Sequence, residues 1–206
     1  MRAAASPHAG RRLFLASTNE HKARELRAAL PGWQIELLRG DEAPAEEGET
    51  FYENARAKAR HGRSLAPPGS WVVGEDSGLE VEGLAGRPGI RSARYAGLRS
   101  TDAENVAKLL ADLVAVRGDG RRARFVSELV CLPPAGAELR ASGTLVGRIA
   151  DEPRGSAGFG YDPVFIPEGE AQTVAELGDA WKARESHRAR AARALREALV
   201  VCGEAV

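Results

Sequence analysis

Hydrophobic and polar positions in the first part of the chain switch between strand-like and helix-like spacing. The apolar run over residues 12–17 predicts a short strand that ends in Ser-Thr-Asn. Apolar residues then recur at helical spacing over residues 20–30, which predicts a helix that Pro31-Gly32 ends. Alternation over residues 33–38 predicts a second strand beside the first.

A second helix is expected after an acidic loop over residues 41–49. Thr50 and Glu53 have the spacing of a capping box, in which each side chain bonds the backbone N–H of the other residue. The Pro-Gly-containing segment 66–69 ends the helix, and its predicted apolar stripe consists of Phe51, Ala55, Ala59 and Leu65.

Residues 71–74 form a short apolar run typical of a buried parallel strand, and they lead directly into Glu75-Asp76-Ser77-Gly78. Ligands of α/β sheets bind outside the carboxyl ends of the strands. We therefore expect these carboxylates at the mouth of the strand, where they are well placed for chemistry. A polar turn is the alternative, because Asp-Ser-Gly is turn-forming.

The remaining pattern completes an α/β fold with a mixed central β-sheet flanked by helices. Residues 1–10 are expected to be a disordered tail and residues 11–206 a single domain, without internal repeats or a linker. The further predicted segments are a glycine-rich loop over 83–97, a helix over 102–113, a β-hairpin over 124–132 and 138–149, a strand over 164–166, and a helix over 186–200.

Composition narrows the function classes. The chain has 206 residues, with 29 Lys and Arg against 29 Asp and Glu, so a general nucleic-acid-binding role is not expected. Two distant cysteines argue against a zinc site or a disulfide scaffold, and a reducing cytoplasm is the default location. No apolar run approaches the roughly 20 residues of a membrane span, so no membrane partner is expected.

The junction between the first strand and the first helix is a candidate phosphate site. Unpaired N–H groups and the positive end of the dipole lie at a helix N-terminus, and Lys22 adds a charge. The segment lacks the GxxxxGK[ST] pattern of a Walker A loop. The alternative is that Thr18 or Asn19 only caps the helix and Lys22 is solvated.

Acidic residues form a second candidate site. Hard divalent ions bind phosphate compounds through one or two carboxylates and water, so Glu46 and Glu75 could hold magnesium while Asp76 activates a water. Because neighbouring strand residues point to opposite faces, Glu75 and Asp76 could have different roles. The alternative is an exposed loop acid at Glu46 and a polar turn at 75–78.

Three further segments carry candidate binding groups. Arg87, Arg91 and Arg94 in the glycine-rich loop could bind phosphate or carboxylate, although a plain surface loop explains the glycines equally well. The segment Gly158-Phe159-Gly160-Tyr161-Asp162-Pro163 could provide a ring on which a base stacks, or Phe159 could pack in the core. Side chains that can donate hydrogen bonds are also concentrated around Ser186-His187-Arg188.

Taken together and in this order, these segments resemble the Ham1/inosine triphosphatase family of pyrophosphatases that act on non-standard purine nucleoside triphosphates. The resemblance extends from about Leu13 to Leu199. It depends on Asn19 and Lys22, on the motifs ENAxxKA, DSGL, PGIxSARYAG and GFGYDPVF, and on Ser186-His187-Arg188.

This resemblance implies two lobes with a cleft between them, and Mg²⁺-dependent hydrolysis of ITP, dITP and XTP to the monophosphate and pyrophosphate. It also implies a homodimer. Ser17, Thr18, Asn19 and Lys22 would contact the triphosphate, with Lys22 also catalytic. Glu46, Glu75 and Asp76 would organise the metal, with Asp76 as the general base. The nucleoside pocket would consist of Ser77, Phe159, Gly160, Tyr161, Asp162, Lys182, His187 and Arg188.

Three departures from the family pattern bear on this expectation. Ser17-Thr18 replaces the usual Thr-Gly, Glu75 replaces Asp, and the segment 181–185 is more basic than is typical. Two other functions are compatible with the residues: a pyrophosphatase for another modified nucleotide, and a nucleotide sensor without catalysis. A substrate panel separates these three.

Overall fold

The computed structural model describes residues 11–38 and 46–203, and the side chains up to residue 200. The tail at 1–10 and most of the acidic loop lie outside these residues. The strands in this part are β1 (Arg11–Leu15), β2 (Trp33–Leu37), β3 (Trp71–Val81), β4 (Arg122–Leu132), β5 (Leu139–Ile149) and β6 (Phe165–Pro167). The α-helices are α1 (Glu20–Ala29), α2 (Phe51–Leu65), α3 (Asp102–Asp112), α4 (Val174–Glu185) and α5 (His187–Gly203), with short 3₁₀ turns at Glu82–Leu84, Gly89–Arg94, Gly118–Arg121 and Asp162–Val164.

The strands form one mixed sheet in the order β2-β1-β3-β4-β5-β6. β1 pairs in parallel with both β2 and β3, whereas β5 and β6 are antiparallel. The α/β fold with a mixed sheet and flanking helices is therefore confirmed.

The chain forms two compact units. Within the described residues, unit 1 consists of 11–38, 46–76, 128–143 and 188–203, and unit 2 of 77–127 and 144–187. The boundary separates Asp76 from Ser77 and His187 from Arg188, so it passes twice between predicted site residues. A single functional domain over 11–206 with a cleft stays a prediction.

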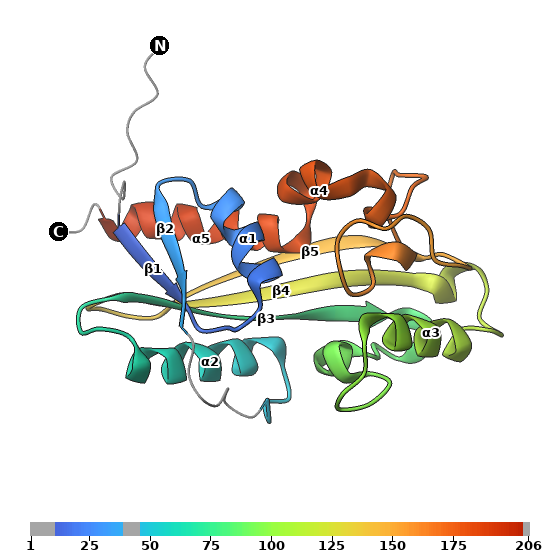
Figure 1. The fold of residues 1–206 in the computed structure, drawn as a ribbon, viewed down its shortest axis with the longest axis horizontal. Coiled ribbons are helices and arrows are strands. Elements are labelled where there is room, and N and C mark those ends of the chain that lie inside the picture. Colours follow the sequence, from blue (N-terminus) through green and yellow to red (C-terminus); the bar gives the residue numbers. More distant parts are fainter. Residues whose placement is uncertain (1–10, 39–45, 204–206) are drawn as a thin grey trace, which may run out of the picture. The chain divides into compact units, whose positions relative to one another are not determined.

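In unit 1, helices cover both faces of the sheet (Figure 1). The apolar sides of α1 and α5 pack with Leu13, Leu15 and Val73 of the sheet in the main core of this unit. On the other face, Ala55 and Ala59 of α2 pack against Val130 of β4. Burial of these apolar side chains stabilises each helix by removing hydrocarbon surface from water.

In unit 2, a second core lies under α3. Val106, Leu109 and Leu113 pack there with residues from β3, β4 and β5, and the rings of Phe125 and Phe165 lie 4.5 Å apart between centroids. Thr101 and Glu104 form a capping box at the start of α3, which satisfies backbone N–H groups that the helix itself leaves unpaired.

Several sequence-based predictions of the elements are confirmed and three are wrong. The capping box of Thr50 and Glu53 is present. Leu65 is 45% exposed, so it does not belong to the buried stripe of α2. β3 does not end at residue 74 but continues to Val81, which excludes the polar turn at 75–78. The pattern also missed α4, which contains a non-helical Gly178 and therefore lacks continuous helical periodicity.

No helix within 11–38 and 46–203 is both long and apolar enough to cross a membrane.

Candidate active site

Two neighbouring carboxylates of β3 lie at the centre of a charged cluster in unit 1. Glu75 is 1% and Asp76 4% exposed. The expected opposite orientation of neighbouring strand residues is observed: Glu75 contacts α1 and α5, whereas Asp76 contacts α2. The two groups therefore have different charged partners.

Glu75 is paired with two cations. Lys22 Nζ lies 2.6 Å from Glu75 Oε2, and Arg188 Nε donates a 3.0 Å hydrogen bond to Oε1. Burial favours the neutral acid, but the charges of Arg188 and Lys22 outweigh it and hold the pKa of Glu75 far below its usual range. Glu75 is thus firmly ionised.

Arg188 is almost completely buried and links α5 to α1 as well as to β3. Its Nη1 donates a 2.5 Å hydrogen bond to Glu25 Oε2, in addition to the bond to Glu75. Burial alone would lower the pKa of Arg188, but the two carboxylates raise it. The Arg188 guanidinium thus contacts two carboxylates within unit 1. The family resemblance places the same group in the nucleoside pocket.

Asp76 faces Lys58 and Asn54 of α2. Lys58 Nζ lies 2.7 Å from Asp76 Oδ1 and 2.5 Å from Glu46 Oε1, so one ammonium contacts both carboxylates. Asn54 Nδ2 donates a 3.2 Å bond to Asp76 Oδ2. Burial raises the pKa of the Asp76 carboxyl even though Lys58 opposes that shift, and a raised pKa suits a carboxylate that accepts a proton.

The close approach of α2 to β3 depends on Gly74. A Cβ atom at Gly74 would meet the carbonyl oxygen of Ala55 and the backbone of Ala59. Without that Cβ, α2 lies directly on the strand and brings Asn54 and Lys58, which are four residues apart on one helix face, to Asp76.

The start of α1 presents the predicted phosphate-binding segment. Asn19 is the N-cap, and its Oδ1 accepts hydrogen bonds from the backbone N–H groups of His21 and Lys22. Ser17 Oγ accepts a 3.1 Å bond from the Asn19 N–H, and Thr18 is exposed. Capping by Asn19 is therefore confirmed, but Lys22 is not simply solvated because it pairs with Glu75.

In unit 2, Phe159, Asp162 and Lys182 come together. Asp162 is 2% exposed and accepts a 2.8 Å bond from the Phe159 N–H and a 2.5 Å bond from Lys182 Nζ. Lys182 Nζ also lies 3.9 Å from the centroid of the Phe159 ring, an arrangement that favours a cation–π interaction. The structure thus joins three of the predicted nucleoside-pocket residues.

The other predicted pocket residues of unit 2 have different surroundings. His187 is buried, and its ring stacks on Phe125 with centroids 4.7 Å apart and planes 12° from parallel. Tyr161 is a core residue whose hydroxyl donates a 2.8 Å bond to the carbonyl of Ser92. Ser77 lies partly buried in β3, and Gly160 follows Phe159 in the loop before the short turn Asp162–Val164.

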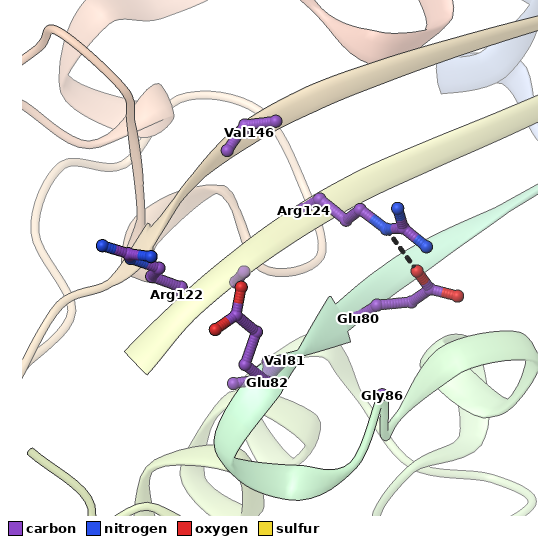
Figure 2. A pocket seen from close by; sticks show the side chains of 8 residues that line it. Glu80, Val81, Glu82, Gly86, Arg122, Arg124 and Val146 are labelled. Atoms are coloured by element: carbon purple, nitrogen blue, oxygen red, sulfur yellow. Dashed lines mark hydrogen bonds and ion pairs between the residues drawn. The ribbon is translucent and has the colours of Figure 1, made fainter. Parts of the chain in front are cut away.

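Two cavities lie in unit 2, and predicted site residues line only one of the two. A cavity of about 520 Å³ lies between α3 and the loop over 153–163, and Gly158, Phe159 and Gly160 line it. Figure 2 shows another cavity, of about 360 Å³, where Arg124 of β4 pairs with Glu80 of β3 at 2.6 Å. None of the predicted site residues lines that second cavity.

Sequence reasoning assigned no role to Lys58, Glu25 or Asp102. Lys58 had a visible signal, since it belongs to the ENAxxKA motif and follows Asn54 by four residues. Glu25 had a weaker one, being three residues after Lys22 on α1. In the described part of the chain, no group of three or more His, Cys, Asp or Glu side chains is arranged to hold a metal ion.

The chain matches known proteins along nearly its whole length. The model of the Ham1 family matches residues 13–198. A dITP/XTP pyrophosphatase of Bdellovibrio bacteriovorus is 46% identical over 194 residues, which cover 91% of this chain and 96% of the relative. The enzyme of the same name from Thermus thermophilus is 44% identical, with 92% of each chain covered.

Solved structures agree with this match. A HAM1 protein from Coxiella burnetii superposes with a TM-score of 0.82 at 36% identity, over 93% of this chain and 99% of that one. The Ham1 protein of Staphylococcus aureus gives 0.80 at 36% identity, over 92% and 98%. The family match covers well over half of the chain, and the relatives cover more than nine tenths of it. The chain belongs to the Ham1 family.

Proposed function

We propose that this protein hydrolyses non-standard purine nucleoside triphosphates, with dITP, ITP and XTP as substrates, to the monophosphate and pyrophosphate. The observation that carries this proposal is the relationship, at 44–46% identity over more than nine tenths of both chains, to proteins named dITP/XTP pyrophosphatase. The buried charges around β3 support it, because a triphosphate needs cations and its hydrolysis needs a proton acceptor.

Asp76 is the proposed general base. Water attacks the α-phosphorus, the bond from that phosphorus to the oxygen bridging to the β-phosphorus breaks, and the carboxylate of Asp76 accepts a proton from the water. Lys58 and Asn54 hold this carboxylate in place at 2.7 Å and 3.2 Å, so the base does not have to be reoriented when substrate binds.

Lys22 is proposed to bind the triphosphate. It follows the N-cap Asn19, so its ammonium lies near the positive end of α1, where phosphate binding is favourable. Binding would exchange its contact with Glu75 for one with a phosphate. Arg188 would then keep Glu75 ionised and in place, because it bonds the other carboxylate oxygen.

Magnesium is part of the proposal. Carboxylate oxygens are the ligands that Mg²⁺ prefers, and Glu46 and Asp76 fit this requirement because both already contact one cation, the ammonium of Lys58. We propose that Glu46 and Asp76 would hold the ion, whereas Glu75, which the resemblance also implies as a ligand, pairs with Lys22 and Arg188 on the other face of β3. Bound there, Mg²⁺ would neutralise charge on the polyphosphate.

Phe159, Asp162 and Lys182 are the proposed base-recognition group of unit 2. The Phe159 ring offers a stacking surface, and Lys182 offers a donor to an oxygen on the base. Hypoxanthine and xanthine carry an oxygen at position 6 where adenine carries an amino group, so a donor distinguishes them from adenine. A homodimer, which the resemblance implies, and a cytoplasmic location complete the proposal.

A panel of nucleoside triphosphates tests this function. The purified protein is incubated with dITP, ITP, XTP, ATP, GTP and a modified pyrimidine triphosphate, with and without Mg²⁺, and pyrophosphate and orthophosphate are measured separately. We expect Mg²⁺-dependent pyrophosphate release from the first three, with ATP and GTP much slower. Preference for the pyrimidine would support the other pyrophosphatase function, and binding of ITP without any release would support a sensor.

A further inference from the structure

The loop that presents Phe159 has a backbone that needs external support. Phe159 lies between Gly158 and Gly160, which have φ values of +80° and +63°. Glycine adopts this left-handed region readily, but it also leaves the backbone with many alternative conformations. The orientation of the Phe159 ring therefore depends on what holds the loop.

Two carboxylates hold this loop. Asp162, at its end, accepts the Phe159 N–H at 2.8 Å. Asp102, the first residue of α3 and 58 positions before Gly160 in sequence, accepts the Gly160 N–H through Oδ2 at 2.6 Å. The backbone amides on both sides of the Phe159 Cα are thus each bound to a carboxylate.

The capping box of α3 does not use the Asp102 carboxylate. The N-cap of α3 is Thr101, and Glu104 completes the capping box by bonding the Thr101 N–H at 2.7 Å. The Thr101 side chain in turn accepts the Glu104 N–H at 3.2 Å, whereas the carboxylate of Asp102 contacts the loop.

The contact also lies at the cavity that Phe159 lines. Asp102 and Phe159 both line the 520 Å³ cavity, whose other side consists of apolar residues of α3 such as Val106 and Leu110. This volume is in the range of small-molecule sites. A loop released from Asp102 would change both the direction of the ring and the width of the cavity.

We propose that Asp102 is a positioning residue for base recognition, which holds the Gly158–Gly160 backbone so that the Phe159 ring is ready to stack on the purine. This inference rests on the proposed function. Asp102 is exposed and acts through the loop rather than on the reacting atoms. Its removal should weaken binding of the base and leave the chemical step unchanged.

The test compares Asp102→Ala, Asp102→Asn and Glu104→Ala with the wild type. KM and kcat are measured for pyrophosphate release from dITP, and affinity is measured for inosine monophosphate and for ribose 5-phosphate, which lacks the base. Asp102→Ala should raise KM and weaken inosine monophosphate about 5- to 10-fold, the effect of losing one charge-assisted hydrogen bond. Its kcat and its affinity for ribose 5-phosphate should stay within about twofold of the wild type.

The other variants separate positioning from helix stability. Asp102→Asn keeps an acceptor oxygen and should recover most of the affinity. Glu104→Ala removes another first-turn acid of α3 and should lower the melting temperature without changing KM. An unchanged KM in Asp102→Ala, or an equal change in Glu104→Ala, would overturn the proposal.

Failure of the proposed hydrolytic function can be told apart from failure of the proposed role of Asp102. If wild type releases no pyrophosphate but binds inosine monophosphate, the hydrolytic function is wrong and the monophosphate affinities still decide the role of Asp102. If wild type neither releases pyrophosphate nor binds inosine monophosphate, both proposals are wrong. Because Asp102 is exposed, all variants should fold, and circular dichroism with thermal melting checks this.

Discussion

The charged cluster of unit 1 and the aromatic loop of unit 2 place their functional groups by different means. Around β3, ionised side chains from α1, α2 and α5 hold Glu75 and Asp76 through ion pairs that are largely buried. Around Phe159, backbone amides between two glycines are bound by Asp162 and Asp102, and one buried pair, Lys182–Asp162, lies beside the ring.

This difference suits two different tasks. A group that moves a proton beside a polyphosphate benefits from fixed charges in a site shielded from water. A ring that stacks on a base needs the right direction, and a glycine-flanked loop with few tethers allows small adjustments. We therefore expect changes around Asp76 and Arg188 in unit 1 to affect kcat or stability, and changes in the loop to affect KM.

The largest effect on activity is expected for Asp76→Asn. The amide cannot accept the proton from water, so kcat for dITP should fall about 10²–10⁴-fold, the usual contribution of a general base. Steady-state pyrophosphate release measures this, with circular dichroism as a check on folding. Asp119→Asn, at an exposed site in unit 2, is the matched control and should retain full activity. Near-normal turnover by a folded Asp76→Asn protein would remove Asp76 from the mechanism.

The largest effect on stability is expected for Arg188→Met. Glu75 and Glu25 would lose their shared cation, and removal of one partner from a buried pair costs about 3–5 kcal/mol. The free energy of unfolding from urea titration measures this loss. Arg190→Met changes an exposed arginine two residues further along α5 and should cost far less. Equal losses in the two variants would show that the buried network does not contribute specifically.

Phe159→Leu tests the aromatic loop. Leucine keeps an apolar side chain but lacks the flat face, and stacking of a base on an aromatic ring contributes about 1–3 kcal/mol. KM for dITP should therefore rise about 5- to 150-fold, while kcat changes little. Leu98→Ala changes an exposed leucine of unit 2 that does not line this cavity and serves as control. A fall in kcat at constant KM would contradict the assignment of the loop to binding.

Gly74→Ala tests whether stability and kcat are linked within unit 1. The new methyl group would meet the backbone of α2, and overpacking of this kind costs about 1–3 kcal/mol. Since α2 carries Lys58 and Asn54, the displacement should lower kcat as well as stability and leave KM nearly unchanged. Gly69→Ala, at an exposed turn with open space around it but with a φ of +77°, should lower stability through backbone strain and leave kcat unchanged, which separates the displacement of α2 from a general loss of stability. A rise in KM alone would count against the role of α2 in holding Asp76.

Local features of the fold were well predicted from the sequence. The junction from β1 to α1 and the capping box of α2 depend on neighbouring residues, so their signals lie within a few positions of each other. The end of β3 was placed wrongly because charged residues usually end a buried strand. Here Glu75 and Asp76 stay inside it because Lys22, Lys58 and Arg188 neutralise them, and these partners lie far away in the chain.

In the candidate site, too, local features could be predicted from the sequence and contacts between distant residues could not. The sequence by itself determined the family, the residue types for acid–base and phosphate chemistry, and the orientation of Glu75 and Asp76 to opposite faces, because motif order and strand periodicity are properties of the chain. Only the tertiary structure decided which cation meets which carboxylate: Arg188 with Glu75 and Glu25, Lys58 with Asp76 and Glu46, and Asp102 with the amide of Gly160. These partners are distant in sequence and come together only when helices pack on the sheet or on a loop, which no local pattern encodes.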